Sequence, residues 1–308
     1  MIGAGRRDIQ RPVWRENGTF RVMRLSMGGS DRCDPGAAPR ALWRAIYPAC
    51  VGLVIQEFEP APALRGVVHR VADFEERSAP LRRLESPLVG VVLVVSLGPD
   101  MEIDGRPVGS FVAGVWDRPT VTGHDGEQAG YQLYLDVLGA RSLLGVPAGE
   151  LANRLVALED VFGEFAVELA ERLAGAPGAQ ERHAIAQTLL ANRLSAEHAP
   201  ARDVAYVLDR LRTTRGAARV ETLAAEVGWS RRHLAARFRD TIGLPPKAIA
   251  RLLRVEHAAQ RVRAGDRLAD IAYAAGYADQ AHFNREFREL VGCTPSKFPF
   301  VQDTLVGA

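Results

Sequence analysis

The sequence contains few cysteines and no long apolar segment. Its three cysteines, Cys33, Cys50 and Cys293, form no closely spaced pair, which argues against a cysteine zinc site or a disulfide framework. We therefore expect reduced thiols and a cytoplasmic location. The longest apolar run covers residues 88–97, whereas a membrane-spanning helix needs about 20 apolar residues. No apolar segment follows the arginines near the N-terminus, so neither a membrane span nor a signal peptide is expected.

Sequence motifs of catalysis are also scarce. We find no nucleophile elbow, no phosphate-binding loop and no paired acidic residues in a catalytic context. His69 and His124 lie 55 positions apart, which is not the spacing of a metal-ligand set. The segment His124-Asp125-Gly126-Glu127 has the composition of a polar turn between two strands, although a metal enzyme of the cupin type with a DNA-binding tail stays open as the alternative. We expect no enzyme activity, no cofactor and no metal.

Lysine is nearly absent, and arginine supplies the positive charge. Of the 39 basic residues only Lys247 and Lys297 are lysine, which we attribute mainly to codon usage. Residues 201–300 hold 18 basic and 11 acidic residues, whereas residues 1–200 hold 21 and 25. The C-terminal third therefore carries +7 in a chain whose net charge is +2, which favours contact of that third with phosphates.

A helix, a glycine turn and a second helix are predicted near the C-terminus. A short apolar helix ends at Gly276, where a tight turn with positive φ is expected. Asp279 suits the N-cap of a second helix over residues 280–291. In that helix Phe283, Phe287 and the apolar residues after them recur at spacings of four and three, as on a buried helix face. The pattern is typical of a helix-turn-helix, whose second helix fits the DNA major groove.

The same pattern occurs earlier in the chain. Gly228-Trp229 corresponds to Gly276-Tyr277, and Ser230 takes the place of the N-cap residue. A helical bundle unrelated to DNA binding is not expected to repeat these positions together, so two helix-turn-helix units are predicted. Five further residues correspond at a constant offset of 49: Leu234, Phe238, Arg239, Gly243 and Pro246 match Phe283, Phe287, Arg288, Gly292 and Pro295.

These residues resemble the signature of the AraC/XylS family of bacterial transcription regulators, and the likeness covers roughly residues 202–300. The chain departs from the family at Phe298-Pro299, where a Tyr-Arg pair is usual, so one basic side chain is lost. The resemblance implies a sequence-specific DNA-binding regulator that reads a split, non-palindromic site as a monomer. The matching residues are Gly276-Tyr277, Gln280, His282-Phe283, Arg285, Phe287-Arg288, Gly292 and Thr294-Pro295.

A long helix over residues 246–264 is predicted to separate the two units. Nineteen residues span about 28 Å at the helical rise, and major-groove faces on one side of DNA repeat every ~34 Å. One rigid helix can therefore place two recognition helices in successive grooves of one duplex face.

The start and the outer face of each recognition helix hold candidate base readers, because side chains there reach base edges. Arginine pairs with guanine and glutamine with adenine, while small residues permit close approach and contact with a thymine methyl. Other arginines are candidate phosphate contacts, which position the protein without specifying sequence. The candidate base readers are Arg231, Arg232, Ala235, Ala236, Gln280, Ala281, His282 and Arg285, and the candidate phosphate contacts are Arg239, Arg251, Arg254 and Arg288.

Residues from about 51 to 135 show the pattern of short β-strands separated by turns, among them an Asp104-Gly105 hairpin signal. Such spacing indicates a small barrel or sandwich. It lies where many regulators of the resembled family carry a cupin-like sensor domain. The segment Trp116-Asp117-Arg118-Pro119 is interpreted as a turn whose tryptophan caps the barrel core, with the rim of a ligand pocket as the alternative.

Helices are expected after the strands, including one amphipathic helix over residues 158–173. They join the domains or dimerise. We therefore predict an α+β chain: a poorly ordered segment 1–40, a sensor or dimerisation domain 41–195 with a small β-barrel of the cupin-like kind and flanking helices, and a DNA-binding domain 201–300 with two helix-turn-helix units joined by a long helix. Double-stranded DNA is the expected partner and a membrane is not; a small-molecule effector, RNA polymerase and a second copy of the chain stay open.

Overall fold

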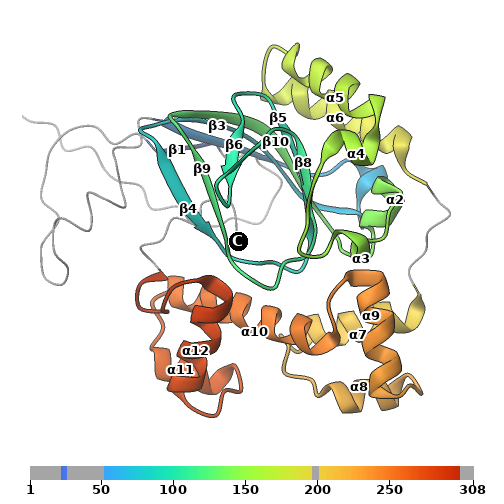
Figure 1. The fold of residues 1–308 in the computed structure, drawn as a ribbon, viewed down its shortest axis with the longest axis vertical. Helices are drawn as coiled ribbons and strands as arrows, with labels where there is room; N and C mark the ends of the chain where they lie inside the picture. The colour runs from blue at the N-terminus through green and yellow to red at the C-terminus, as the bar shows by residue number, and fades with distance from the viewer. Residues whose placement is uncertain (1–21, 26–51, 196–200, 299–308) are drawn as a thin grey trace, which may run out of the picture.

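The computed structural model describes residues 22–25, 52–195 and 201–298. A β-rich N-terminal domain lies above an all-helical C-terminal domain (Figure 1), which confirms the predicted α+β organisation. Most of residues 1–40, whose poor order was predicted, fall outside the described residues. The exception is Val22–Leu25, strand β1, which pairs antiparallel with β2. No helix in the described part of the chain combines the length and the apolar character needed to span a bilayer.

The N-terminal domain contains two antiparallel sheets. The larger sheet has the order β1-β2-β3-β10-β5-β8-β11 and the smaller has the order β4-β9-β6-β7. The hairpin between β6 and β7 turns through Asp104 and Gly105, both at positive φ, as their sequence predicts. The strands after β1 are β2 Gly52–Phe58, β3 Val68–Arg77, β4 Leu81–Glu85, β5 Val91–Ser96, β6 Met101–Ile103, β7 Arg106–Val108, β8 Phe111–Ala113, β9 Thr120–His124, β10 Glu127–Leu135 and β11 Leu155–Ala157.

The predicted small β-barrel does not close, because no strand among the described residues pairs from one sheet to the other. Strand β10 shows the physical reason. Tyr131 and Leu133 point to one side and join the core beneath the helices, whereas Gln132 and Tyr134 point to the space between the sheets. Since this strand is buried on both faces, helices must cover one face and the second sheet the other. The domain is a sandwich, which was the alternative to the barrel.

Five helices cover the outer face of the larger sheet in the described structure. The single helix predicted over residues 158–173 is instead two, because Gly163 at φ 59° and ψ −138° separates them. The last helix, α6, is held to β3 by Arg182, whose Nε lies 2.6 Å from Asp73 Oδ2. These helices therefore form part of the N-terminal core. They are α2 Ala140–Leu144, α3 Ala148–Leu151, α4 Leu158–Phe162, α5 Glu164–Ala174 and α6 Ala179–Arg193.

A buried polar cluster lies at one end of the sandwich. The Glu76 side chain has no exposed surface and pairs with Arg83, and Gln128 Nε2 donates to Glu76 Oε2 at 2.7 Å. His124 Nε2 lies 3.2 Å from the same oxygen. Burial raises the pKa of Glu76, but the hydrogen bonds and charge of Arg83 outweigh it and hold the pKa below its usual value. His124 thus belongs to an ion-pair cluster.

The two histidines considered for a metal site lie far apart. His69 Nε2 contacts Asp136 Oδ2 at 3.0 Å near the start of β3, while His124 contacts Glu76 near its end. Positions 69 and 76 lie seven steps apart along the strand, which is about 23 Å. No group of three potential metal ligands occurs among the described residues, and His124-Asp125-Gly126-Glu127 forms the turn between β9 and β10.

Candidate nucleic-acid interface

The first helix-turn-helix consists of α8, Val220–Glu226, and α9, Arg231–Ile242. Gly228 makes the turn between them at φ 70°. Ser230 caps α9, since its side chain accepts a hydrogen bond from His233 N at 3.1 Å. Both the turn glycine and the cap residue are confirmed.

The second unit repeats this geometry with α11, Leu268–Ala274, and α12, Gln280–Val291. The bounds of α12 are those predicted from the sequence. Gly276 makes the turn at φ 74°, and Asp279 caps α12 by accepting from His282 N at 2.6 Å. Phe283 and Phe287 are fully buried, so the polar face of the helix is left for solvent or a partner.

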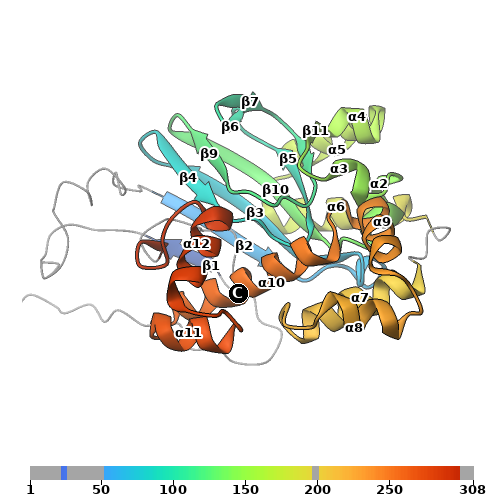
Figure 2. The same cartoon turned by 60° about the horizontal axis from the view of Figure 1, so that its bottom comes forward.

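The spacer is α10, Pro246–Arg263, with α9 and α12 at its two ends (Figures 1 and 2). Its 18 residues span about 27 Å. The supporting helix α7, Arg202–Thr213, packs its predicted apolar face into the same core. The two recognition helices therefore belong to one body with a stiff connection.

The structure places every candidate base reader on the surface or partly on it. Arg231 also lies 2.8 Å from Glu221 of α8, and an exposed ion pair of this kind contributes little stability. The ring of half-buried His282 meets the ring of Tyr277 edge-on at 5.2 Å, which fixes its direction. The exposed candidates are Arg231, Arg232, Ala236, Gln280, Ala281 and Arg285, and the half-buried ones are Ala235 and His282.

The four candidate phosphate contacts fall into two groups. Arg239 and Arg288 are exposed. Arg251 and Arg254 instead extend from α10 to Glu286 of α12, each with a nitrogen 3.0 Å from a carboxylate oxygen. A phosphate contact by Arg251 or Arg254 stays a prediction, and it has to compete with this carboxylate.

Glu286 was not singled out from the sequence, yet it ties the second recognition helix to the spacer. Besides the two arginines it accepts a hydrogen bond from Tyr277 Oη at 2.9 Å. Burial raises the pKa of Glu286, but its hydrogen bonds, that from Arg254 foremost, hold the pKa below the usual value. The available signal was its position, three residues after Phe283 and four before Leu290, which puts an acidic residue on the buried face.

Both recognition helices meet the N-terminal domain at their C-terminal ends. Gly243, the C-cap of α9, packs so closely that a Cβ there would lie 2.2 Å from Ala152 Cβ, directly after α3. Gly292, the C-cap of α12, lies against Leu84 and Pro119 in the same way. The N-terminal halves of α9 and α12, which hold the candidate base readers, therefore point away from the N-terminal domain.

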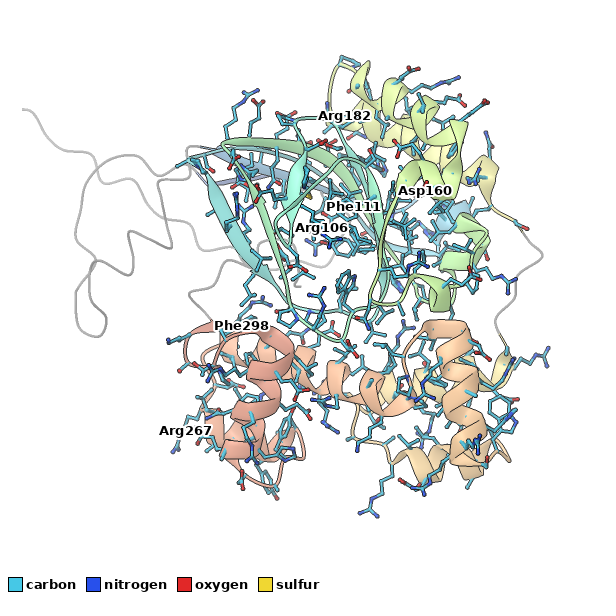
Figure 3. The ribbon with its side chains drawn as sticks, viewed as in Figure 1. Arg106, Phe111, Asp160, Arg182, Arg267 and Phe298 are labelled. Carbon is cyan, nitrogen blue, oxygen red and sulfur yellow. The ribbon has the colours of Figure 1, made fainter. Side chains whose placement is uncertain are left out.

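A third contact joins the domains through α7. Arg212 Nη2 lies 2.7 Å from Asp136 Oδ2 at the end of the large sheet. Figure 3 shows Phe298 on the side of the helical domain that faces the sheets. Phe298, where the chain departs from the resembled family, is buried against Phe287 with ring centroids 5.3 Å apart. The lost tyrosine is thus replaced by a core aromatic.

The C-terminal domain is similar in sequence to known DNA-binding domains. A helix-turn-helix domain model matches residues 223–299. Over 80 residues the chain is 38% identical to the RCS-specific HTH-type transcriptional activator RclR of Escherichia coli K12, a match that covers 26% of this chain and 28% of that protein. It is 35% identical over 80 residues to an AraC-like transcription regulator of Streptomyces lividans, covering 26% of each. The C-terminal domain is an AraC-type helix-turn-helix domain. The match spans about a third or less of the first relatives' own length, so the likeness concerns the AraC-type domain alone.

Solved structures also resemble the chain, though more distantly. The structure of ToxT from Vibrio cholerae with bound unsaturated fatty acid covers 82% of this chain and 100% of its own, with a TM-score of 0.47 and 10% identity. A second structure of ToxT from Vibrio cholerae, in a P21 crystal form, covers 75% of this chain and 97% of its own, with a TM-score of 0.46 and 12% identity. Likeness at this level gives no ground for transferring a ligand from ToxT to this protein.

Proposed function

We propose that the protein is a sequence-specific DNA-binding transcription regulator that reads two successive major grooves with α9 and α12. The observation that carries this function is the pair of capped recognition helices at the two ends of one rigid spacer, each with its N-terminal half exposed. The AraC-type domain and the regulators that share it support the proposal. A metal enzyme of the cupin type is not favoured, because His69 and His124 are engaged at opposite ends of β3.

The N-terminal domain is proposed to be the part that responds to a small-molecule effector. It has a cavity between its sheets and touches both recognition helices, so a bound molecule there can influence them. A cupin-like ancestry of the sandwich, contact with RNA polymerase and pairing of two copies stay predictions of the same kind.

Selection of bound sequences from a randomised duplex library tests the proposal. The enriched sites should contain two blocks of fixed sequence whose centres lie about 10–10.5 base pairs apart, the spacing of major grooves on one face. Arg232→Ala should relax sequence preference at one position of one block and Arg285→Ala at one position of the other. Enrichment of a single block, or of none, contradicts the proposed reading by two helices.

Arg285→Ala should weaken binding to the selected site by about 1–3 kcal/mol and relax preference at one position, because arginine reads guanine through two hydrogen bonds. Fluorescence anisotropy on the selected site and on single-base variants measures both effects. Arg172→Ala on the exposed face of α5 is the matched control and should change neither. An equal loss on every sequence would show that Arg285 makes no base contact.

Arg288→Ala should weaken binding almost equally on all sequences. Removal of one phosphate contact releases one counterion fewer, so the slope of log K against log salt should fall by about 0.9. Titrations at several salt concentrations give this slope. An unchanged slope together with lost sequence preference would reassign Arg288 to the base readers.

A further inference from the structure

The cavity between the sheets has a mostly apolar wall. Its volume is about 130 Å³, and side chains from both sheets line it. Phe111, within the sandwich in Figure 3, and Phe74 contribute from the larger sheet and Ile103 from the smaller. Half-buried Trp116 also lines it, as the alternative interpretation of that turn expected, with Arg118 stacked 4.5 Å over its ring. An apolar cavity of roughly 150 Å³ holds one benzene ring, so this volume suits a ligand of about that size.

Two residues that line the cavity each carry a buried polar atom that lacks a hydrogen-bond partner within the described residues. These atoms are Arg83 Nε and Ser86 Oγ, both without exposed surface. The Arg83 side chain is 5% exposed. A buried donor left unpaired costs stability, and a hydrogen-bond acceptor on a bound molecule is the kind of group that would satisfy these donors. Arg83 and Ser86 therefore mark the part of the lining that favours a hydrogen-bond acceptor.

Both arginines that line the cavity already have acidic partners. Glu76 neutralises Arg83, and Arg118 at the rim lies 3.0 Å from Asp104. Glu85 adds a further carboxylate to the lining and accepts from Thr122 Oγ1 at 3.0 Å. A ligand carboxylate would therefore be desolvated beside Glu85, and neither arginine of the described lining is left without an acidic partner to meet it.

We propose that this cavity binds an uncharged, largely apolar molecule of about one aromatic ring, whose hydrogen-bond acceptor meets Arg83 Nε and Ser86 Oγ. A ketone, ester, lactone or amide carbonyl provides such an acceptor. This assignment deepens the proposed function and rests on it only for the role of the ligand as an effector, since binding itself needs no DNA.

The cavity wall is continuous with the surfaces that hold both recognition helices. On β4, Arg83 and Glu85 face the cavity, and Leu84 between them faces out to Gly292 of the second unit, where an added Cβ would lie 2.9 Å from Leu84 Cδ2. On the other side Gly114 lines the cavity and packs against the Leu151 carbonyl of α3, the helix that touches α9. A ligand that shifts β4 or Gly114 therefore shifts the surface against which a recognition helix packs.

Three probes of similar size test the ligand class on the full-length protein without DNA. Acetophenone has a neutral acceptor, ethylbenzene has none and benzoate has a charge. Ligand-observed NMR and thermal melting should show acetophenone binding at least about tenfold more tightly than either. Tighter binding of benzoate, equal binding of all three, or no binding of acetophenone at 5 mM would each overturn the proposal.

Two variants place the acetophenone in the cavity. Val94→Phe fills the space and should abolish binding, while Ser86→Ala should keep ethylbenzene binding and reduce the advantage of acetophenone. If Val94→Phe does not fold, Ser86→Ala decides alone, and an unchanged advantage there overturns the site. DNA affinity with and without acetophenone is then a separate measurement. Cavity binding without any change in DNA affinity leaves the ligand class standing and contradicts the effector part of the proposed function.

Discussion

Phe287→Ala is expected to lower the free energy of unfolding of the C-terminal domain by about 3–5 kcal/mol, the usual cost of a cavity left by a buried phenylalanine. Phe287 is fully buried and lies between two other rings, 5.5 Å from Phe283 and 5.3 Å from Phe298. Phe283 lies on α12 itself and Phe298 on the segment that follows it, so these rings can collapse only partly into the space. Urea unfolding followed by helical circular dichroism measures the loss.

The matched control is Tyr273→Ala in the same helix-turn-helix unit. Tyr273 is 88% exposed, so removing its side chain should change the free energy of unfolding by no more than about 0.5 kcal/mol. If both variants unfold at the wild-type urea concentration, Phe287 is not a core residue. Loss of DNA binding by Phe287→Ala at a temperature where the variant remains folded would also contradict a purely structural role.

Glu76→Ala should lower the free energy of unfolding of the N-terminal domain by about 3–5 kcal/mol, because it leaves the Arg83 guanidinium buried without its partner. The side chains of Glu76 and Arg83 are 0% and 5% exposed. Glu127→Ala, which breaks the exposed Arg77–Glu127 pair nearby, is the control and should cost at most about 1 kcal/mol. Replacing both charges, as Glu76→Leu with Arg83→Met, should recover most of the loss. A double variant as unstable as Glu76→Ala would assign the loss to packing.

The same cluster gives the protein an acid-sensitive stability. The pKa of Glu76 is lowered in the folded state, so its contribution is present above its ordinary value of 4.5 and is lost as pH falls through the lower folded pKa. Burial also lowers the pKa of His124 below 6.5, so stability decreases as pH falls below that value. Wild-type stability should therefore fall on acidification, and Glu76→Ala should remove the part below about pH 4.5.

Local signals in the sequence were enough to predict the C-terminal domain. Ser230 and Asp279 cap their helices by accepting a hydrogen bond from the backbone N–H three residues later. Gly228 and Gly276 adopt the positive φ that the tight turn between the two helices requires. Each of these features depends on residues a few positions apart. For that reason the bounds of the second recognition helix, α12, followed from spacing and capping alone.

The N-terminal domain was harder to predict because its strands pair over long distances. Strand β10 lies between β3 and β5, and the five-residue strand β4 has a mixed composition that gives no strand pattern by itself. The helix break at Gly163 was not predicted, because the spacing of apolar residues is helical on both sides of it. Whether short strands close into a barrel or form two sheets depends on which faces the helices cover, and the helices come later in the chain.

The sequence by itself determined that two helix-turn-helix units exist, where the second recognition helix begins and ends, and which side chains occupy the outer faces of both, because caps, turns and helical periodicity are local. Only the tertiary structure decided that Glu286 binds Arg251 and Arg254 and that an apolar cavity lies between the sheets. It also decided that Gly243 and Gly292 pack against the N-terminal domain. Those contacts join residues distant in the chain, and burial and charge pairing act on distances in space.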